Sequence, residues 1–222
     1  MNLFRNLDFS RTVRPVRRAI LLFVKYPEPG KVKTRLAATM GAEKAAKIYQ
    51  RLVAAVLPGL PTGDDLTVVY DPPEKRAEVM AWLQSLLAGR RAQFTAQTGG
   101  DLGARLEHAF AAAFERGFEQ VAVIGSDCIE LNPATFFAAW RALETHDAAL
   151  GPSTDGGYYL LALKQPCAAL FQGIAWSTDA VRKQTLARAH AAGLSVEELA
   201  VLPDIDTEAD WVESARRLRV EN

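Results

Sequence analysis

The feature that most constrains the fold is an alternation of short apolar runs with segments of helical periodicity. The first run, Ala19 to Val24, is purely apolar and is ended by lysine, proline and glycine, which is typical of a buried strand followed by a loop. The alanine-rich stretch Gly41 to Leu57 then repeats apolar residues at helical spacing until Pro58 and Gly59 stop it. The sequence therefore begins with a strand, a loop and a helix.

The same alternation continues along the chain. Further strands are expected at 66–70, 92–96, 121–124, 148–150 and 158–163, and further helices at 74–87, 102–116, 133–144, 178–191 and 207–219. This order predicts one α/β domain with a Rossmann-like, mixed and mostly parallel sheet that carries helices on both faces. Ligands of such sheets gather at the carboxyl ends of the strands, so the functional residues are expected in the loops there.

Size and composition exclude several classes of protein. The 222 residues are enough for one domain, which we place at 19–222. The 26 Lys plus Arg balance the 26 Asp plus Glu, so the protein has no net electric field that would attract nucleic acid or an anionic membrane. No apolar run approaches the roughly 20 residues of a membrane span. The two cysteines, Cys128 and Cys167, have no metal-binding spacing, which favours a reducing, cytoplasmic location.

Residues 1–18 are predicted to form a basic N-terminal arm. Five arginines stand there against one acid, Asp8, and the segment lacks the apolar core of a signal peptide. Two interpretations stay open, a solvated arm that leads into the first strand and an organellar presequence.

The loop after the first strand, KYPEPGKVKTRL, carries four cations, Lys25, Lys31, Lys33 and Arg35. Such side chains neutralise phosphate oxygens, and Gly30 allows the backbone to approach a ligand closely. Thr34 can add a hydroxyl group or cap the next helix. The loop matches neither the Walker A pattern GxxxxGK[ST] nor the dinucleotide-binding pattern GxGxxG. It therefore predicts a phosphate site that belongs to neither class. The alternative is a solvated basic turn.

A second loop, IGSDCIEL, follows the strand at 121–124 and presents Asp127. A carboxylate at a strand end that faces phosphate is a common way to hold Mg²⁺ or Mn²⁺, so Asp127 is predicted to be a metal ligand. The alternative is that Asp127 caps the following turn. Glu130 is a weaker candidate, because the alternative is a surface residue in front of Asn132, an expected helix cap.

Two later loops add candidates. In GPSTDGGYYLLAL, Asp155 precedes Gly156 and Gly157, which permits a sharp turn that brings a carboxylate and backbone amides to the cleft; a plain hairpin turn is the alternative. In LPDIDTEADW, Asp206 is predicted to be a second metal ligand, although acids are also common in the first turn of a helix. Trp176 is either an acceptor-side residue or part of a packed turn.

Together, KYPEPGKVKTRL, GSDCIEL, GPSTDGGYYLLAL and DIDTEADW resemble a bacterial family of uncharacterised glycosyltransferase-A-type proteins, some of which are named arsenosugar-biosynthesis glycosyltransferases. The chain is more distantly similar to guanylyltransferases that act on molybdenum cofactor or phospholactate. The resemblance runs from about Ala19 to Trp211 and implies the nucleotide-diphospho-sugar transferase fold. One departure is that the family usually has proline and aspartate after the cysteine, where this chain has Ile129 and Glu130.

The resemblance implies phosphate contacts by Lys25, Lys33 and Arg35, metal binding by Asp127, and substrate contacts by Asp155, Gly156 and Gly157. The segment QTGGDLGARL adds Gln97, Asp101 and Arg105 near the nucleotide. The complete prediction has four parts: catalytic residues Asp127, Asp155 and Lys33; phosphate or nucleotide contacts Lys25, Gly30, Lys31, Lys33, Thr34, Arg35, Gln97, Asp101 and Arg105; substrate contacts Asp155, Gly156, Gly157, Tyr158 and Trp176; and metal ligands Asp127 and Asp206.

Three functions are consistent with these motifs. The resemblance implies a Mg²⁺- or Mn²⁺-dependent glycosyl transfer from a nucleotide-diphosphate sugar to a small acceptor. The basic loop also suits a nucleotidylyltransferase that joins a nucleoside triphosphate to a phosphorylated small molecule, because several cations match a triphosphate. The third possibility is a nucleotide-sugar-binding protein without catalysis. The sequence predicts no nucleic-acid partner and leaves the oligomeric state open.

Overall fold

A seven-stranded sheet forms the centre of the computed structural model, which describes residues 14–220 and the side chains of 14–215. Strand β1 (Arg18–Lys25) lies inside the sheet and pairs in parallel with β2 (Asp65–Asp71) and with β4 (Gln120–Ile124). Its apolar side chains are buried on both faces of the sheet, which is the reason for the continuous apolar run in the sequence.

The remaining strands extend the sheet on both sides in the order β3-β2-β1-β4-β6-β5-β7. They are β3 (Ala92–Ala96), β5 (Ala148–Pro152), β6 (Tyr158–Leu163) and β7 (Val196–Glu198). Strand β6 runs antiparallel to β4 and to β5, whereas the other pairings are parallel. The predicted mixed, mostly parallel sheet is therefore confirmed, and β6 begins at the edge where β5 ends.

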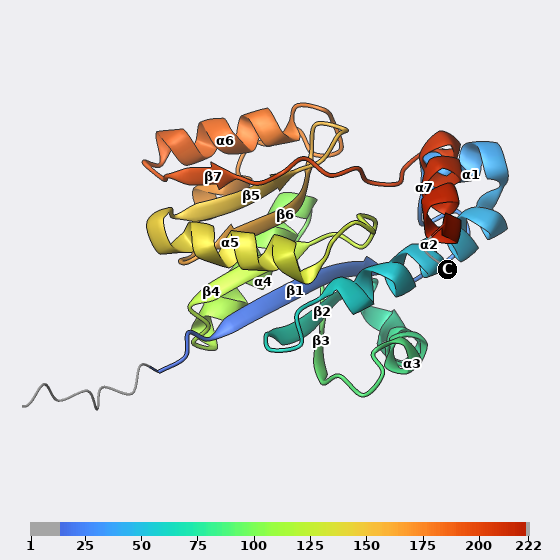
Figure 1. The fold of residues 1–222 in the computed structure, drawn as a ribbon, viewed down its shortest axis with the longest axis horizontal. Coiled ribbons are helices and arrows are strands. Elements are labelled where there is room, and N and C mark those ends of the chain that lie inside the picture. The colour runs from blue at the N-terminus through green and yellow to red at the C-terminus, as the bar shows by residue number, and fades with distance from the viewer. Residues whose placement is uncertain (1–13, 221–222) are drawn as a thin grey trace, which may run out of the picture.

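Helices cover both faces of the sheet, as Figure 1 shows. Helices α2 (Ala42–Val56), α3 (Arg76–Leu86) and α5 (Pro133–Thr145) pack in one apolar core, and α4 (Leu102–Glu115) and α6 (Val181–Ala191) pack in the other. Short 3-10 helices occur at Leu57–Gly59, Pro73–Lys75 and Ala168–Phe171. The fold is that of one α/β domain, as the sequence predicted.

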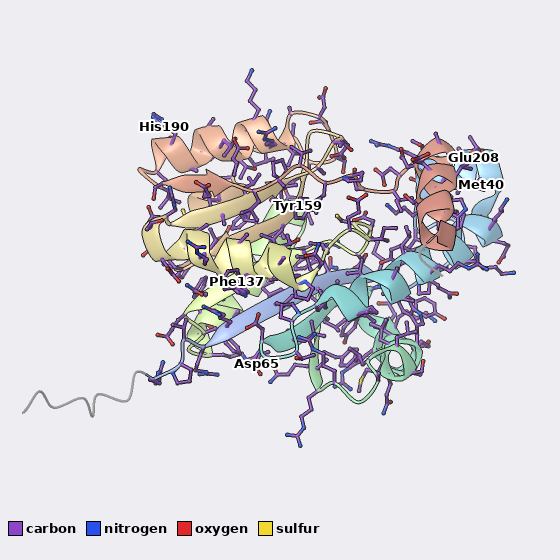
Figure 2. The ribbon with its side chains drawn as sticks, viewed as in Figure 1. Met40, Asp65, Phe137, Tyr159, His190 and Glu208 are labelled. Carbon is purple, nitrogen blue, oxygen red and sulfur yellow. The ribbon has the colours of Figure 1, made fainter. Side chains whose placement is uncertain are left out.

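A long C-terminal crossing brings distant parts of the chain together. After β7 the chain passes along the end of β5 and across the molecule to α7 (Glu208–Val220), which lies beside the short helix α1 (Thr34–Met40). Figure 2 shows Met40 and Glu208 on these two neighbouring helices. Ile205 anchors the crossing in a third apolar cluster with Leu36 and Leu52. The sequence predicted α7 but neither α1, β7 nor this crossing.

Side chains cap helices α4 and α5, and the cap expected at Asn132 is confirmed. The side chain of Asp101 accepts a hydrogen bond from the backbone of Ala104 at the start of α4, and that of Asn132 accepts from Ala134 at the start of α5. No helix within 14–220 is both long enough and apolar enough to cross a membrane.

Residues 1–13 of the predicted basic arm lie outside the described residues. The described end of the arm contacts the turn before β4: Arg14 forms a 2.8 Å ion pair with Glu119, and the guanidinium of Arg17 donates to the carbonyl of Arg116. Both cysteines are free.

Candidate active site in the cleft at the strand ends

The carboxyl ends of β1, β4 and β5 meet the start of β6 around a cleft of about 890 Å³. This volume lies in the range of about 300–1,000 Å³ that is usual for small-molecule sites. The loops that the sequence analysis selected all reach this cleft, because parallel strands deliver their following loops to the same edge of a sheet.

Most of the predicted site residues line the cleft. They are Lys25, Lys31, Lys33, Thr34, Arg35, Gln97, Arg105, Asp127, Asp155, Gly157, Tyr158, Trp176 and Asp206. Gly30, Asp101 and Gly156 are not among the lining residues. The side chain of Asp101 is used to cap α4, and Gly156 packs with its backbone against Asp179, so local structure accounts for both motif residues.

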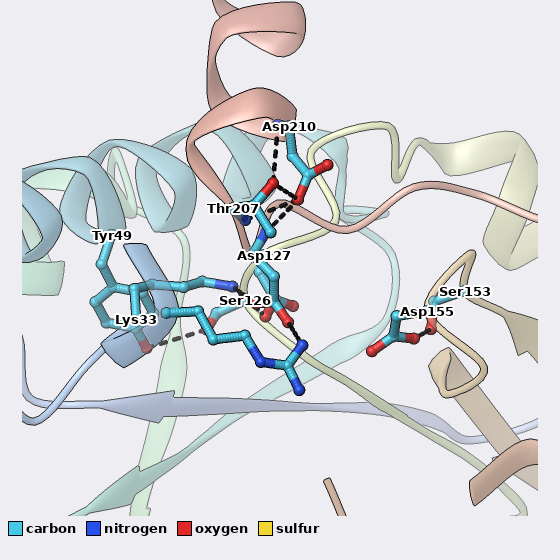
Figure 3. Close-up of polar contacts among 10 residues, drawn as sticks. Lys33, Tyr49, Ser126, Asp127, Ser153, Asp155, Thr207 and Asp210 are labelled. Atoms are coloured by element: carbon cyan, nitrogen blue, oxygen red, sulfur yellow. Dashed lines mark hydrogen bonds and ion pairs between the residues drawn. The ribbon is translucent and has the colours of Figure 1, made fainter. Parts of the chain in front are cut away.

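Lys33 is held between two carboxylates at the centre of the site (Figure 3). Its Nζ lies 2.8 Å from Oδ2 of Asp127 and 2.6 Å from Oδ1 of Asp206, and only 6% of its side chain is exposed. Burial by itself lowers the pKa of this ammonium group, but the charges of Asp127 and Asp206 outweigh burial and raise it above its ordinary value. The ammonium is therefore charged at neutral pH.

The backbone of Lys33 has the left-handed conformation, with φ of 46°. This conformation is uncommon for residues with a side chain and often marks a functional position. It occurs where the loop turns into α1, and Leu36 of that helix is fully buried. The fold thus directs Lys33 inward, whereas Lys31 and Arg35 on either side are exposed.

A buried tyrosine connects the first two loops. The hydroxyl of Tyr49 on α2 accepts a hydrogen bond from the backbone N–H of Lys25 and lies 3.0 Å from Oγ of Ser126. Burial raises the pKa of this phenol, so Tyr49 stays neutral and acts as a fixed hydrogen-bonding group between the loops. The sequence analysis did not identify Tyr49, because it lies on a helix with no motif.

Asp206 also belongs to a cluster of three carboxylates, together with Asp155 and Asp204. Oxygen atoms of Asp155, Asp204 and Asp206 all lie within 4.8 Å of one another, which is a separation that one divalent cation can bridge. The side chain of Asp155 is oriented by hydrogen bonds from Oγ of Ser153 at 2.6 Å and from the backbone N–H of Gly157 at 2.8 Å. The predicted turn therefore also aims a carboxylate into the cleft.

Asp204 was missed by the sequence analysis as a site residue. Burial, followed by the charges of Asp155 and Asp127, raises its pKa to about 7. The Asp-Ile-Asp pattern of residues 204–206 could have identified it in the sequence. Alternate side chains of an extended segment lie on the same face, and Ile205 is buried, so Asp204 and Asp206 lie together on the opposite face. The backbone N–H of Ile205 donates to the carbonyl of Asp127 and fixes the segment there.

Asp210 of LPDIDTEADW has another role. Asp210 accepts hydrogen bonds from the backbone and the hydroxyl of Thr207, and the backbone N–H of Asp210 lies 3.3 Å from that hydroxyl. This is a reciprocal cap at the start of α7. It positions the segment that carries Asp204 and Asp206.

At the β2 and β3 side, Gln97 and Arg105 form one network. The amide of Gln97 donates to the carbonyls of Val24 and Val69, and its oxygen accepts from Arg105. Arg105 also lies 3.4 Å from Asp71. These contacts give Gln97 a structural role at the strand ends and leave Arg105 at the wall of the cleft.

Trp176 lines the cleft beside the N-terminal turn of α4, the helix that also carries Arg105. Its indole N–H is buried and has no hydrogen-bond partner within the described part of the chain. A Cβ at Gly103 would lie 2.8 Å from this nitrogen, so the glycine is needed for the close approach. None of the three histidines is among the residues that line the cleft: His108 lies on α4, His146 directly follows α5, and His190 lies on α6 (Figure 2).

The solved structures that are similar to the chain include the following three. A protein of Desulfovibrio desulfuricans G20, provisionally named a nucleotide-diphospho-sugar transferase, is 39% identical with a TM-score of 0.79, over 87% of this chain and 84% of that one. A CMP:2-keto-3-deoxy-manno-octonic acid synthetase solved with CTP is 16% identical with a TM-score of 0.53, over 92% and 99%. Rv0371c of Mycobacterium tuberculosis H37Rv, solved with manganese, is 16% identical with a TM-score of 0.53, over 90% and 98%.

The first similarity confirms the nucleotide-diphospho-sugar transferase fold, and the other two support the fold alone. No curated protein matches the chain. Residues 60–178, about half of the chain, match a family described as an uncharacterized protein conserved in bacteria. The chain therefore belongs to this bacterial family, DUF2064, and has the nucleotide-diphospho-sugar transferase fold.

Proposed function

We propose that the protein is a divalent-metal-dependent glycosyltransferase that transfers a sugar from a nucleotide-diphosphate sugar to a small acceptor without a phosphate group. The fold of the 39% identical relative, with the name given to it, supports a transferase that uses nucleotide sugars. The choice between glycosyl and nucleotidyl transfer rests on how charge is distributed in the cleft.

The charged residues that line the cleft come from different parts of the chain according to their sign. The lining residues before Asp127 supply the cations Lys25, Lys31, Lys33, Arg35 and Arg105. The lining residues after it supply Asp155, Asp179, Asp204 and Asp206, with no lysine, arginine or histidine among those the structure describes. A phosphorylated acceptor beside Asp155, Asp179 and Asp204, which form no ion pair with another described residue, would meet like charge, whereas hydroxyl groups could donate to these carboxylates.

The cations that line the cleft are also more neutralised than the sequence indicates. Lys33, Arg35 and Arg105 each form an ion pair with an aspartate, while no ion pair joins Lys25 or Lys31 to another described residue. Two unpaired cations match a diphosphate better than a triphosphate. This argument favours a nucleotide-diphosphate donor.

In the proposed reaction, Lys25 and Lys31 bind the donor's diphosphate, and Lys33 with Arg35 positions the carboxylates. Asp127 and Asp206 would hold Mg²⁺ or Mn²⁺, with Asp155 and Asp204 near enough to Asp206 to contribute. The metal would stabilise the negative charge of the departing diphosphate. Trp176 and Tyr158 also line the cleft, where their rings can pack against the acceptor.

Nucleotidyl transfer is the second candidate, supported by the similarity to a synthetase solved with CTP. A product assay distinguishes the two. The protein is incubated with Mn²⁺, a panel of nucleoside triphosphates and nucleotide-diphosphate sugars, and a matched pair of acceptors, a polyol and its phosphate ester. We expect mass spectrometry to detect a glycosylated polyol and free nucleoside diphosphate.

Release of pyrophosphate with the phosphate ester would instead establish nucleotidyl transfer, and nucleotide binding without either product would establish a binding protein. Asp127→Asn should abolish the dependence on Mn²⁺, because it removes a negatively charged ligand. Asp65→Asn is the matched control, since Asp65 is exposed at the start of β2 and away from the cleft (Figure 2). Metal dependence retained in Asp127→Asn would remove Asp127 from the metal site.

A further inference from the structure

The ammonium group of Lys33 lies between Asp127 and Asp206, the two predicted metal ligands, where a metal ion shared by both carboxylates would be expected. It bonds to one oxygen of Asp127 and to one oxygen of Asp206, while Nη1 of Arg35 lies 3.3 Å from the other oxygen of Asp206. Both oxygens of Asp206 therefore already face a positive charge from the protein. A divalent cation that binds Asp206 must displace one of these partners or share an oxygen with it.

We propose that Lys33 is an internal counter-ion that competes with divalent cations for Asp127 and Asp206. The inference rests on the proposed function only in taking these two aspartates as metal ligands. It assigns Lys33 a positioning and gating role at the metal site, before its ammonium group contacts phosphate.

Burial makes this competition strong. The Lys33 side chain is 6% exposed, and the two carboxylates are about one-third exposed, so solvent screens their interaction only in part. Arg35 differs, because its side chain is 61% exposed and its distance to Asp206 is longer. Water screens such an exposed pair, which makes Lys33 the main competitor.

The conformation of the loop keeps the competitor in place. Lys33 has a left-handed backbone at the start of α1, and the buried side chains of Val32 and Leu36 anchor the loop on both sides. The ammonium can leave Asp206 by rotation of its flexible side chain. It then needs another anion, and the phosphate groups of a nucleotide are the anions expected at this end of the cleft. Metal binding is thereby coupled to the arrival of phosphate.

The test is the affinity of the full chain for Mn²⁺ alone, measured by the loss of the free-ion signal in electron paramagnetic resonance. Lys33→Met removes the charge and keeps an apolar stem. We expect Mn²⁺ to bind this variant about tenfold or more tightly than the wild type, because a positive charge next to the ion's place is gone. Lys33→Arg keeps the charge and should bind Mn²⁺ about as weakly as the wild type.

Lys31→Met is the matched control, because Lys31 belongs to the same loop and lines the same cleft but forms no ion pair with any described residue. It should change the affinity by less than about threefold, since an exposed charge is screened. If Lys33→Met does not fold, Lys33→Gln replaces it, because an amide has two donors for the same two carboxylates and no charge.

An unchanged or weaker affinity in the folded, uncharged variant would overturn the proposal, and a weaker affinity would show that Lys33 assists metal binding. Equal tightening in Lys31→Met would overturn it too, because the effect would then come from general charge. Failure of the proposed function is a separate result: a protein that transfers no sugar but binds Mn²⁺ more tightly without Lys33 refutes glycosyl transfer and retains this inference.

Discussion

Replacement of Asp204 by asparagine tests the electrostatics of the carboxylate cluster. The pKa of Asp204 is raised to about 7 from an ordinary 3.8, first by burial and then by Asp155 and Asp127. Because the folded value lies above the unfolded value, the folded state binds more protons between about pH 4 and 7. Asp204 therefore lowers stability as the pH rises through this window.

The size of the effect follows from the shift. A three-unit shift corresponds to roughly 4 kcal/mol at most. The carboxyl group is only partly buried and water screens it, so about 1–2 kcal/mol is a better expectation. For a domain of this size, that amounts to about 3–6 °C in Tm.

The assay is thermal unfolding of the wild type and Asp204→Asn at pH 5 and pH 8 in EDTA. At pH 8 we expect the variant to be more stable by about 3–6 °C, because its neutral amide avoids the cost of ionisation. At pH 5 the difference should become small, because Asp204 is then protonated in the wild type. Added Mn²⁺ should stabilise the wild type more than the variant, since a bound cation needs the carboxylate.

A stability difference that does not change between pH 5 and pH 8 would refute this reasoning. The difference would then arise from packing or hydrogen bonding, which do not titrate in this range. Asp65→Asn serves as the control, because Asp65 is exposed and lies outside the cluster.

Two further predictions concern local structure. Gly156→Ala should destabilise the protein by about 2 kcal/mol or more, because Gly156 has φ of 89° and a Cβ there would lie 2.3 Å from the carbonyl oxygen of Asp179. Thermal unfolding measures this loss as a lower Tm. The control is Gly63→Ala, which should leave Tm nearly unchanged because a Cβ at Gly63 meets nothing within 4 Å. Equal losses in both variants would contradict the role given to Gly156. Asn132→Ala should cost about 1 kcal/mol through loss of the cap of α5, seen as a lower midpoint in urea, whereas Asn132→Asp should retain most of the stability.

Local patterns determined much of the fold. The apolar runs and the helical periodicity predicted the main strands and helices to within a few residues, because buried strands and amphipathic helices impose their periods on the sequence. The short helix α1 and strand β7 were missed, since seven and three residues carry too little periodicity. The carboxyl-end rule also predicted that the loops containing Lys25, Asp127 and Asp155 would share one cleft.

What the sequence alone determined about this protein is which loops meet and which chemical groups they carry. Only the tertiary structure decided how these groups pair. Lys33 and Asp206 are separated by 173 residues in the chain, and the crossing after β7 brings them to 2.6 Å. A loop that looks strongly basic in sequence is thereby partly neutralised. Ion pairs between distant segments depend on packing, which no local period records.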